Sequence, residues 1–222
     1  MIKPQRAISL LAKTEPKYYI TTTLLNSWER MSLAISNTKS SERDKISYED
    51  KQVDNYEKAK AEFIDTLNKI QKPPTEYMQR GLEYESSVYN GEDEVFSPIV
   101  NGGEFQAAYQ KEIKICGMNI VLYGILDCLK AGIIYDIKRT EYYTPRHYKW
   151  SHQHAMYLKL VPSAKKFCYL IRDDVSHHIE TYEPANCENI ENTIATFFSW
   201  LQSNDLMELY KEKWQWDKRK KH

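Results

Sequence analysis

Apolar residues recur at the spacing of an amphipathic helix in the first part of the chain. Residues 21–36 carry four of them on one face, which are Leu24, Leu25, Trp28 and Met31. The same kind of pattern covers residues 48–70, which are followed by a pair of prolines, and residues 75–89. A polar stretch at residues 36–45 separates the first two patterns and reads as a loop. This part of the chain therefore predicts three helices.

The middle of the chain changes to the short alternating runs that are typical of strands. Five strands are predicted, at residues 108–116, 119–129, 133–138, 165–172 and 177–182. The short links between the first three predict an antiparallel meander, and a helix that begins near Gln153 separates this meander from the last two strands. Residues 90–103 have no regular pattern and are expected to be irregular. Two further helices are predicted at residues 188–202 and 205–214.

These elements predict one α/β (α+β) domain with a mixed central sheet flanked by helices. The chain has 222 residues and is 41% hydrophobic, which is enough for a sizeable core but leaves no room for an attached helicase motor. We expect a single domain over residues 1–222. Its parts are a helical region at about 20–90, a sheet core at about 105–185 and closing helices at about 188–215.

Charge and hydropathy narrow the possible partners. No apolar run approaches the roughly 20 residues that a membrane helix requires, and the N-terminus has no clear cleavage site, so a cytoplasmic protein without a membrane contact is expected. The formal net charge is zero. Because affinity for a phosphate backbone depends on lysines and arginines, any contact with DNA must come from a local arrangement of cations.

Two acidic residues and a lysine form the most informative pattern in the chain. Asp136 and Lys138 are two residues apart on a predicted strand, so both side chains face one side, about 7 Å apart. Asp127 ends the preceding strand, and a tight connection would bring it beside Asp136. An acid followed by a lysine is common on solvated strands, but apolar flanks place these acids at the ends of core strands, where unpaired charge is costly. A divalent cation with oxygen ligands, Mg²⁺ or Mn²⁺, would offset that cost.

Further motifs surround these two strands. Gly124 stands three residues before Asp127, and a Gln-x-x-x-Tyr motif follows the lysine at Gln153 and Tyr157. Upstream, a glycine and an acidic residue share a predicted helix, as Gly81 and Glu85. Together these motifs resemble the PD-(D/E)XK nucleases, in the branch that contains the RecB-type nuclease domain and the lambda exonuclease. The resemblance covers about residues 21–182, and the combination is specific although each piece alone is weak.

The resemblance implies a restriction-endonuclease-like core and a role for each residue of the motifs. The implied catalytic residues are Glu85, Asp127, Asp136 and Lys138. The implied metal ligands are Glu85, Asp127, Asp136 and the position of Ile137. Gln153 and Tyr157, which are neighbours on one helix face, would contact DNA or brace the lysine. From the residues alone, an ordinary surface glutamine and a half-buried tyrosine are favoured at these two positions.

The segment that follows the lysine combines cations with aromatic rings. The DNA contacts predicted there are Arg139, Tyr142, Tyr143 and Arg146. Cations can meet phosphates and rings can stack on bases, whereas the alternative is an ordinary loop that leads into the next helix. The end of the chain, residues 211–222, is also basic and aromatic, and is either a second contact or a frayed terminus.

The cysteines bear on the choice between branches of the family. They are widely scattered, at Cys116, Cys128, Cys168 and Cys187, whereas relatives that carry an iron-sulfur cluster group three of its ligands closely. The first three fall within predicted strands, where a free cysteine behaves as a small core residue. We therefore expect no iron-sulfur cluster, no zinc site and no disulfide.

The resemblance implies a magnesium-dependent DNA exonuclease of the kind that phages and prophages use in recombination. Two alternatives stay open, which are an endonuclease that acts on branched or single-stranded DNA and a non-cleaving DNA-binding descendant of the fold. The complete acidic and lysine set argues against the second alternative. By analogy, the resemblance also implies a single-strand annealing protein as a companion, and it leaves a homo-oligomer open.

Overall fold

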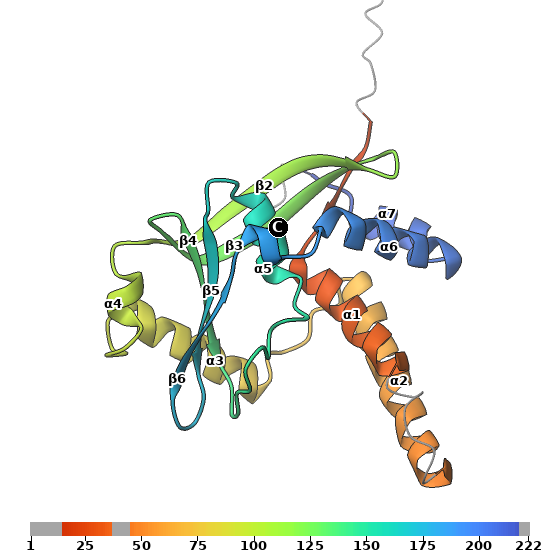
Figure 1. Cartoon of the computed structure of the whole chain (residues 1–222). Helices are drawn as coiled ribbons and strands as arrows, with labels where there is room; N and C mark the ends of the chain where they lie inside the picture. The colour runs from red at the N-terminus through yellow and green to blue at the C-terminus, as the bar shows by residue number, and fades with distance from the viewer. Residues whose placement is uncertain (1–14, 37–44, 218–222) are drawn as a thin grey trace, which may run out of the picture.

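The computed structural model describes residues 15–36 and 45–217, which form a mixed sheet with helices on both sides (Figure 1). The predicted polar loop at residues 36–45 falls almost wholly outside the described residues, as do residues 1–14 and 218–222. The predicted mixed α/β architecture is confirmed within the described part of the chain.

The sheet has six strands among the described residues, in the order β1-β3-β4-β5-β6, with β2 also paired to β3. Their bounds are β1 Lys17–Ile20, β2 Glu104–Ile115, β3 Met118–Lys130, β4 Ile133–Arg139, β5 Lys166–Arg172 and β6 His177–Tyr182. β3 is antiparallel to β2 and β4 and parallel to β1, while β5 is parallel to β4 and antiparallel to β6. The predicted meander is therefore confirmed as β2, β3 and β4.

The helices follow the predicted spacing of apolar positions. Their bounds are α1 Thr22–Ser36, α2 Lys45–Leu67, α3 Glu76–Tyr89, α4 Ser97–Val100, α5 Gln153–Leu160, α6 Ile190–Ser203 and α7 Met207–Lys213, with a 3₁₀ turn at Pro184–Asn186. α3 begins where the sequence predicts, because the Thr75 side chain caps it by accepting a hydrogen bond from the Met78 backbone N–H at 3.2 Å. None of the helices within the described ranges is long and apolar enough to cross a membrane.

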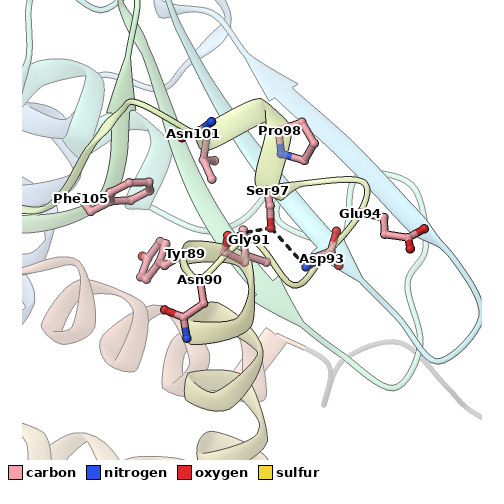
Figure 2. A pocket seen from close by; sticks show the side chains of 11 residues that line it. Tyr89, Asn90, Gly91, Asp93, Glu94, Ser97, Pro98, Asn101 and Phe105 are labelled. Atoms are coloured by element: carbon pink, nitrogen blue, oxygen red, sulfur yellow. Dashed lines mark hydrogen bonds between the residues drawn. The ribbon is translucent and has the colours of Figure 1, made fainter.

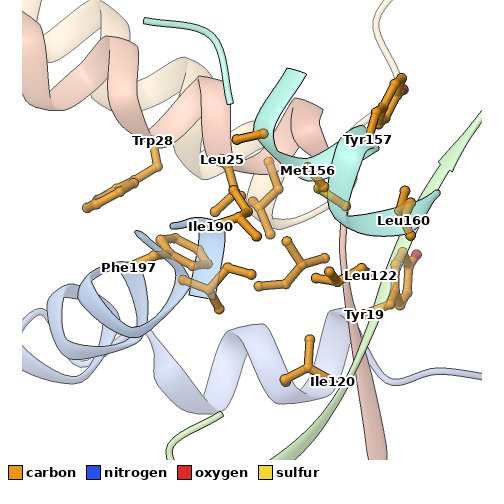
Figure 3. Packing of buried hydrophobic residues seen from close by; sticks show 14 of the residues in the cluster. Tyr19, Leu25, Trp28, Ile120, Leu122, Met156, Tyr157, Leu160, Ile190 and Phe197 are labelled. Carbon is orange, nitrogen blue, oxygen red and sulfur yellow. The ribbon is translucent and has the colours of Figure 1, made fainter. Parts of the chain in front are cut away.

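Buried apolar side chains form two clusters. The larger one joins α1, α5 and α6 to the first half of β3, and includes Leu25, Leu122, Met156 and Phe197 (Figure 3). The smaller one joins α3 and α4 to the strands that carry the acidic motif, and consists of Val88, Phe96, Val100, Cys128, Ile137 and Leu170. The predicted position of the acids at the ends of the strands is wrong, because Asp127 lies three residues before the end of β3 and Asp136 lies in the middle of β4, which stays paired with β5 as far as Arg139.

Three local features differ from the prediction. β1 is absent from it, because its four residues are too few for a periodic signal and their partner, β3, lies about 100 positions further along the chain. Residues 90–103 contain the one-turn helix α4. Cys116 does not lie in a strand, since β2 ends at Ile115 and Cys116 occupies an exposed turn with a φ of 48°.

The end of the chain is packed rather than free as far as it is described. Trp214 is buried, and its indole N–H donates a hydrogen bond to the Leu67 carbonyl at 2.8 Å. Gln215 forms an isolated bridge with Tyr18 of β1. These contacts hold residues 214–215 against the core, so the aromatic part of the predicted basic tail serves packing.

Candidate active site

The β3–β4 hairpin places the two aspartates opposite each other. Ala131 and Gly132 form its turn with φ values of 51° and 76°, the left-handed pair that closes a tight hairpin. The strands pair from Lys130 and Ile133 as far as Cys128 and Tyr135. One step further, where Asp127 faces Asp136, the ladder ends. There the Asp127 Oδ2 atom accepts a hydrogen bond from the Ile137 backbone N–H at 2.9 Å, so a carboxylate takes the place of a strand carbonyl.

Asp136 and Lys138 share one face of β4, as their spacing predicts. The Asp136 side chain is fully buried, accepts a hydrogen bond from the Gln153 amide and forms an ion pair with the Lys138 ammonium. Its Oδ2 atom has that ion pair but no hydrogen bond. Burial raises the pKa of Asp136, and the attraction of Lys138 opposes the rise. For Lys138, burial acts to lower the pKa, but the Asp136 and Asp127 carboxylates outweigh it and raise the pKa.

Glu85 reaches the same region from α3. Its Oε1 atom lies 2.5 Å from both the Tyr89 hydroxyl and the Gln106 amide nitrogen. The Tyr89 hydroxyl also lies 3.2 Å from the Asp127 carbonyl, which connects α3 to β3. Burial raises the pKa of Glu85, and the Asp127 carboxylate raises it further. The three acidic side chains therefore act on one another as like charges. Glu83 is exposed on another face of α3.

The types of donor in this cluster fit a hard divalent cation. Carboxylates of Glu85, Asp127 and Asp136, together with the Ile137 backbone, are oxygen donors of the kind that Mg²⁺ and Mn²⁺ prefer. As they stand, no three His, Cys, Asp or Glu side chains among the described residues converge closely enough to hold a metal. Each carboxylate instead has a hydrogen-bond partner in the protein. Binding of one cation by all three carboxylates therefore requires their side chains to move closer together.

Two residues at this site, Tyr89 and Gln106, are not predicted from the sequence. Tyr89 lies one turn after Glu85 on α3, so helical spacing alone could have suggested it. Gln106 lies on β2 opposite Asp127 and has a left-handed backbone with a φ of 51°, a placement that only the fold reveals. The Tyr89 ring also lines a cavity of about 390 Å³ between the end of α3 and α4 (Figure 2). None of the four predicted catalytic residues lines that cavity, so the candidate site is the carboxylate cluster.

Gln153 and Tyr157 both lie on α5 but have different surroundings. Gln153 contacts Asp136 directly, so it braces the aspartate rather than the lysine. Tyr157 is only 5% exposed, and its hydroxyl donates a hydrogen bond to the Ile125 carbonyl at 3.0 Å. A side chain this buried offers little surface to DNA. The placement of Tyr157 instead ties α5 to β3 two residues before Asp127.

Gly124 is required by this contact between α5 and β3. A Cβ atom at position 124 would lie 2.5 Å from the Tyr157 ring, which is buried and hydrogen-bonded. We expect Gly124→Ala to lower the free energy of unfolding by about 1–3 kcal/mol, the usual cost of overpacking. Gly81→Ala is the matched control, because a Cβ atom there meets nothing within 4 Å and alanine favours the middle of α3. Urea unfolding measures both, and equal effects would contradict the proposed contact.

The four predicted DNA contacts after β4 divide into two pairs. Arg139 forms an ion pair with Asp174, and the Tyr143 hydroxyl donates a hydrogen bond to Glu180 at 2.9 Å. These two side chains are held by the protein itself. Tyr142, which is 73% exposed, and Arg146 are open to solvent. A contact with DNA is therefore easier to reconcile with Tyr142 and Arg146 than with Arg139 and Tyr143.

His152 joins three segments next to the site. It precedes α5, and its ring pairs with Glu188 and, at 3.6 Å, with Glu29 of α1. Burial acts to lower the pKa of His152, but the two glutamates outweigh it and raise the pKa to about 9. The folded protein thus holds this proton more tightly than the unfolded chain, whose histidine titrates near pH 6.5.

The raised pKa of His152 predicts a dependence of stability on pH. The contribution of protonated His152 to the free energy of unfolding is fully present below about pH 6.5 and is lost as the pH rises through about 9. We expect the free energy of unfolding to fall by about 1–3 kcal/mol over that interval. Urea unfolding at several pH values measures the fall, and His152→Gln should remove most of it. His147→Gln, on the same segment but exposed, is the control. An unchanged slope in His152→Gln would contradict the assignment.

Comparisons with known proteins show a likeness of the fold only. No protein-family model matches the chain, and no curated protein matches it. The crystal structure of SSO0001 is similar with a TM-score of 0.50 and 14% identity, over 87% of this chain and 81% of that one. A protein from Eubacterium rectale described as a candidate exonuclease is similar with a TM-score of 0.42 and 13% identity, over 88% of this chain and 82% of that one. At such identities the likeness to SSO0001 concerns the arrangement of the backbone.

Proposed function

We propose that this protein is a metal-dependent deoxyribonuclease that degrades linear DNA as an exonuclease. The observation that supports the proposal most strongly is the end of the β3–β4 ladder at Asp127 and Asp136. There a fully buried aspartate pairs with Lys138 while a second carboxylate replaces a backbone acceptor. Burying such charges costs folding free energy, so their presence within core strands favours a functional reason.

Each residue of the cluster has a role in this proposal. Glu85, Asp127, Asp136 and the Ile137 carbonyl would hold Mg²⁺ or Mn²⁺. Such an ion supplies Lewis-acid chemistry, which activates water and stabilises charge on a phosphate. Lys138 holds a positive charge where negative charge develops on the phosphate, as its raised pKa allows. Gln153 orients Asp136, and Tyr89 with Gln106 orients Glu85.

Digestion of defined DNA substrates tests the proposed activity. In the presence of Mg²⁺ we expect linear DNA to be shortened from its ends and closed circular DNA to survive, and we expect a chelator to stop the reaction. Cutting of the circle would favour an endonuclease that acts on branched or single-stranded DNA. Binding without any cleavage would favour a non-cleaving descendant of the fold. The same residues could also serve an endonuclease, because the cluster would act on one phosphate whether it lies near a DNA end or within the strand.

The resemblance of the sequence motifs supports a role in phage or prophage recombination, a single-strand annealing companion and assembly into a homo-oligomer. A cytoplasmic location is proposed from the hydropathy of the chain. Measurement of mass in solution would test assembly into a homo-oligomer. Co-purification with an annealing protein encoded nearby would test the companion.

A further inference from the structure

A groove leads from the surface to the candidate site. It has a volume of about 520 Å³ and runs between α1 and residues 147–153. The residues at its inner end include Lys138 and Gln153, which both contact Asp136. The outer walls carry Arg30 of α1 and Trp150. A molecule that fills this α1 groove therefore lies in line with the candidate catalytic centre.

The walls of the α1 groove differ in chemistry. The α1 wall carries the exposed cation Arg30 and the acid Glu29, whose carboxylate lies 3.6 Å from the His152 ring. The opposite wall carries the rings of His147, Tyr148 and Trp150. Trp150 is 63% exposed, which is unusual for the largest apolar side chain. Lys149 lies over its ring, 4.9 Å from the centroid, and lines a separate cavity of about 260 Å³ that Trp150 also borders. Lys149 does not line the α1 groove, whereas Trp150 does.

The two walls are tied to each other where the groove ends. The Asn26 Oδ1 atom accepts a hydrogen bond from the His152 backbone N–H at 3.0 Å, and the Asn26 amide lies 3.4 Å from the Ser151 hydroxyl. Tyr148 is stacked on Tyr169 of β5, with ring centroids 4.5 Å apart and planes 22° apart. The groove therefore has a fixed position relative to β4, and the Tyr148 ring is already held in place before a ligand binds.

We propose that the α1 groove binds an unpaired nucleic-acid strand, with a base stacked on Trp150 and a phosphate next to Arg30. An exposed aromatic ring can stack on any base of a single strand, whereas in a duplex only the terminal base pairs have an open face. The net charge of zero also disfavours a duplex, whose hold on a protein depends on many cations. The inference rests on the proposed nuclease function, since it specifies which strand reaches that site.

Equilibrium binding of a labelled 12-nucleotide oligothymidylate, measured by fluorescence anisotropy in a chelating buffer, tests this inference without cleavage. We expect Trp150→Ala to weaken binding by about 5- to 100-fold, the loss expected for one stacked base. Trp150→Phe, which keeps a ring, should restore most of the affinity. Phe105→Ala is the control, because Phe105 is an exposed aromatic side chain that does not line the groove and is not among the predicted DNA contacts.

The charge on the α1 wall has its own test. Arg30→Gln should reduce the dependence of binding on salt by about 0.7 in the logarithmic slope, the value for one phosphate contact in a single strand. Lys58→Gln, which changes an exposed cation of α2 outside the groove, should leave the slope unchanged. A 12-base-pair duplex should bind more weakly than the single strand and lose little on Trp150→Ala.

Several results would overturn the inference. These are equal losses in Trp150→Ala and Phe105→Ala, no loss in either, or a duplex that binds as tightly as the single strand and depends equally on Trp150. Unfolding midpoints of the variants show whether any loss reflects the fold, and recovery in Trp150→Phe distinguishes stacking from misfolding. Cleavage without a Trp150 effect would reject this inference alone. Binding in the groove without cleavage by the intact protein would reject the nuclease function alone.

Discussion

Asp136→Asn should reduce Mg²⁺-dependent cleavage by well over a hundredfold while leaving the protein folded. Loss of a residue that only orients a metal ligand already costs about 10- to 100-fold, so loss of a charged ligand should cost more. The fold should persist because asparagine has the same shape, and because burial already raises the pKa of Asp136 and so disfavours its charged form. Asp127→Asn should behave similarly, since an amide oxygen can still accept the hydrogen bond from the Ile137 N–H.

Three measurements together test this expectation. Single-turnover digestion gives the cleavage rate, calorimetric titration with Mn²⁺ gives the metal affinity, and thermal unfolding reports the fold. Glu83→Gln is the control, because Glu83 is an exposed acid on the same helix as Glu85 and should have no effect. Glu85→Gln should weaken both metal binding and cleavage. Near-normal cleavage in either aspartate variant would show that the site lies elsewhere.

Lys138→Met should slow cleavage by at least about a hundredfold, the range expected when one charge-stabilising group is removed. Methionine keeps most of the apolar stem, which is relevant because the Lys138 side chain is only 30% exposed. Its loss also removes the ion pair with Asp136, so two explanations have to be distinguished. If Lys138 acts on the phosphate, metal and DNA should still bind and the rate should stay low at every metal concentration.

The alternative is that Lys138 only holds Asp136 in position. In that case the metal affinity of Lys138→Met should fall, and the rate should recover fully at saturating Mn²⁺. Single-turnover cleavage across a metal titration distinguishes the two, and complete recovery would rule out a direct role. Lys166→Met is the control, because Lys166 lies on the neighbouring strand β5 and pairs with Glu183 on the surface. It should cleave at the normal rate.

Local patterns account for most of the secondary structure. The helical spacing of apolar residues predicts α1 and α3 to within one residue of their observed bounds, and the alternating runs predict β3 and β4 equally well. The period of a strand is also sufficient to predict that Asp136 and Lys138 share a face. Together with the tight turn at residues 131–132, it brings Asp127 opposite Asp136. These relations span no more than about a dozen residues, within which the backbone geometry leaves few choices.

Such local patterns do not predict contacts between distant segments. The sequence motif pairs Gln153 with Tyr157, yet only packing decides that Gln153 reaches Asp136 while Tyr157 is buried against Gly124. The position of Gln106 beside Glu85 likewise depends on how α3 docks against β2.

The sequence by itself therefore determined most of the elements and the acidic hairpin with its lysine. Only the tertiary structure decided which side chains orient that hairpin, and it alone brought α1 beside residues 147–153, more than 100 positions away, to form the groove. The physical reason is that a local pattern is fixed by the dihedral angles and burial of adjacent residues. The docking of separate elements depends instead on the complementary shapes and hydrogen bonds of their surfaces. No repeating pattern in the sequence links the residues of one surface to those of the other.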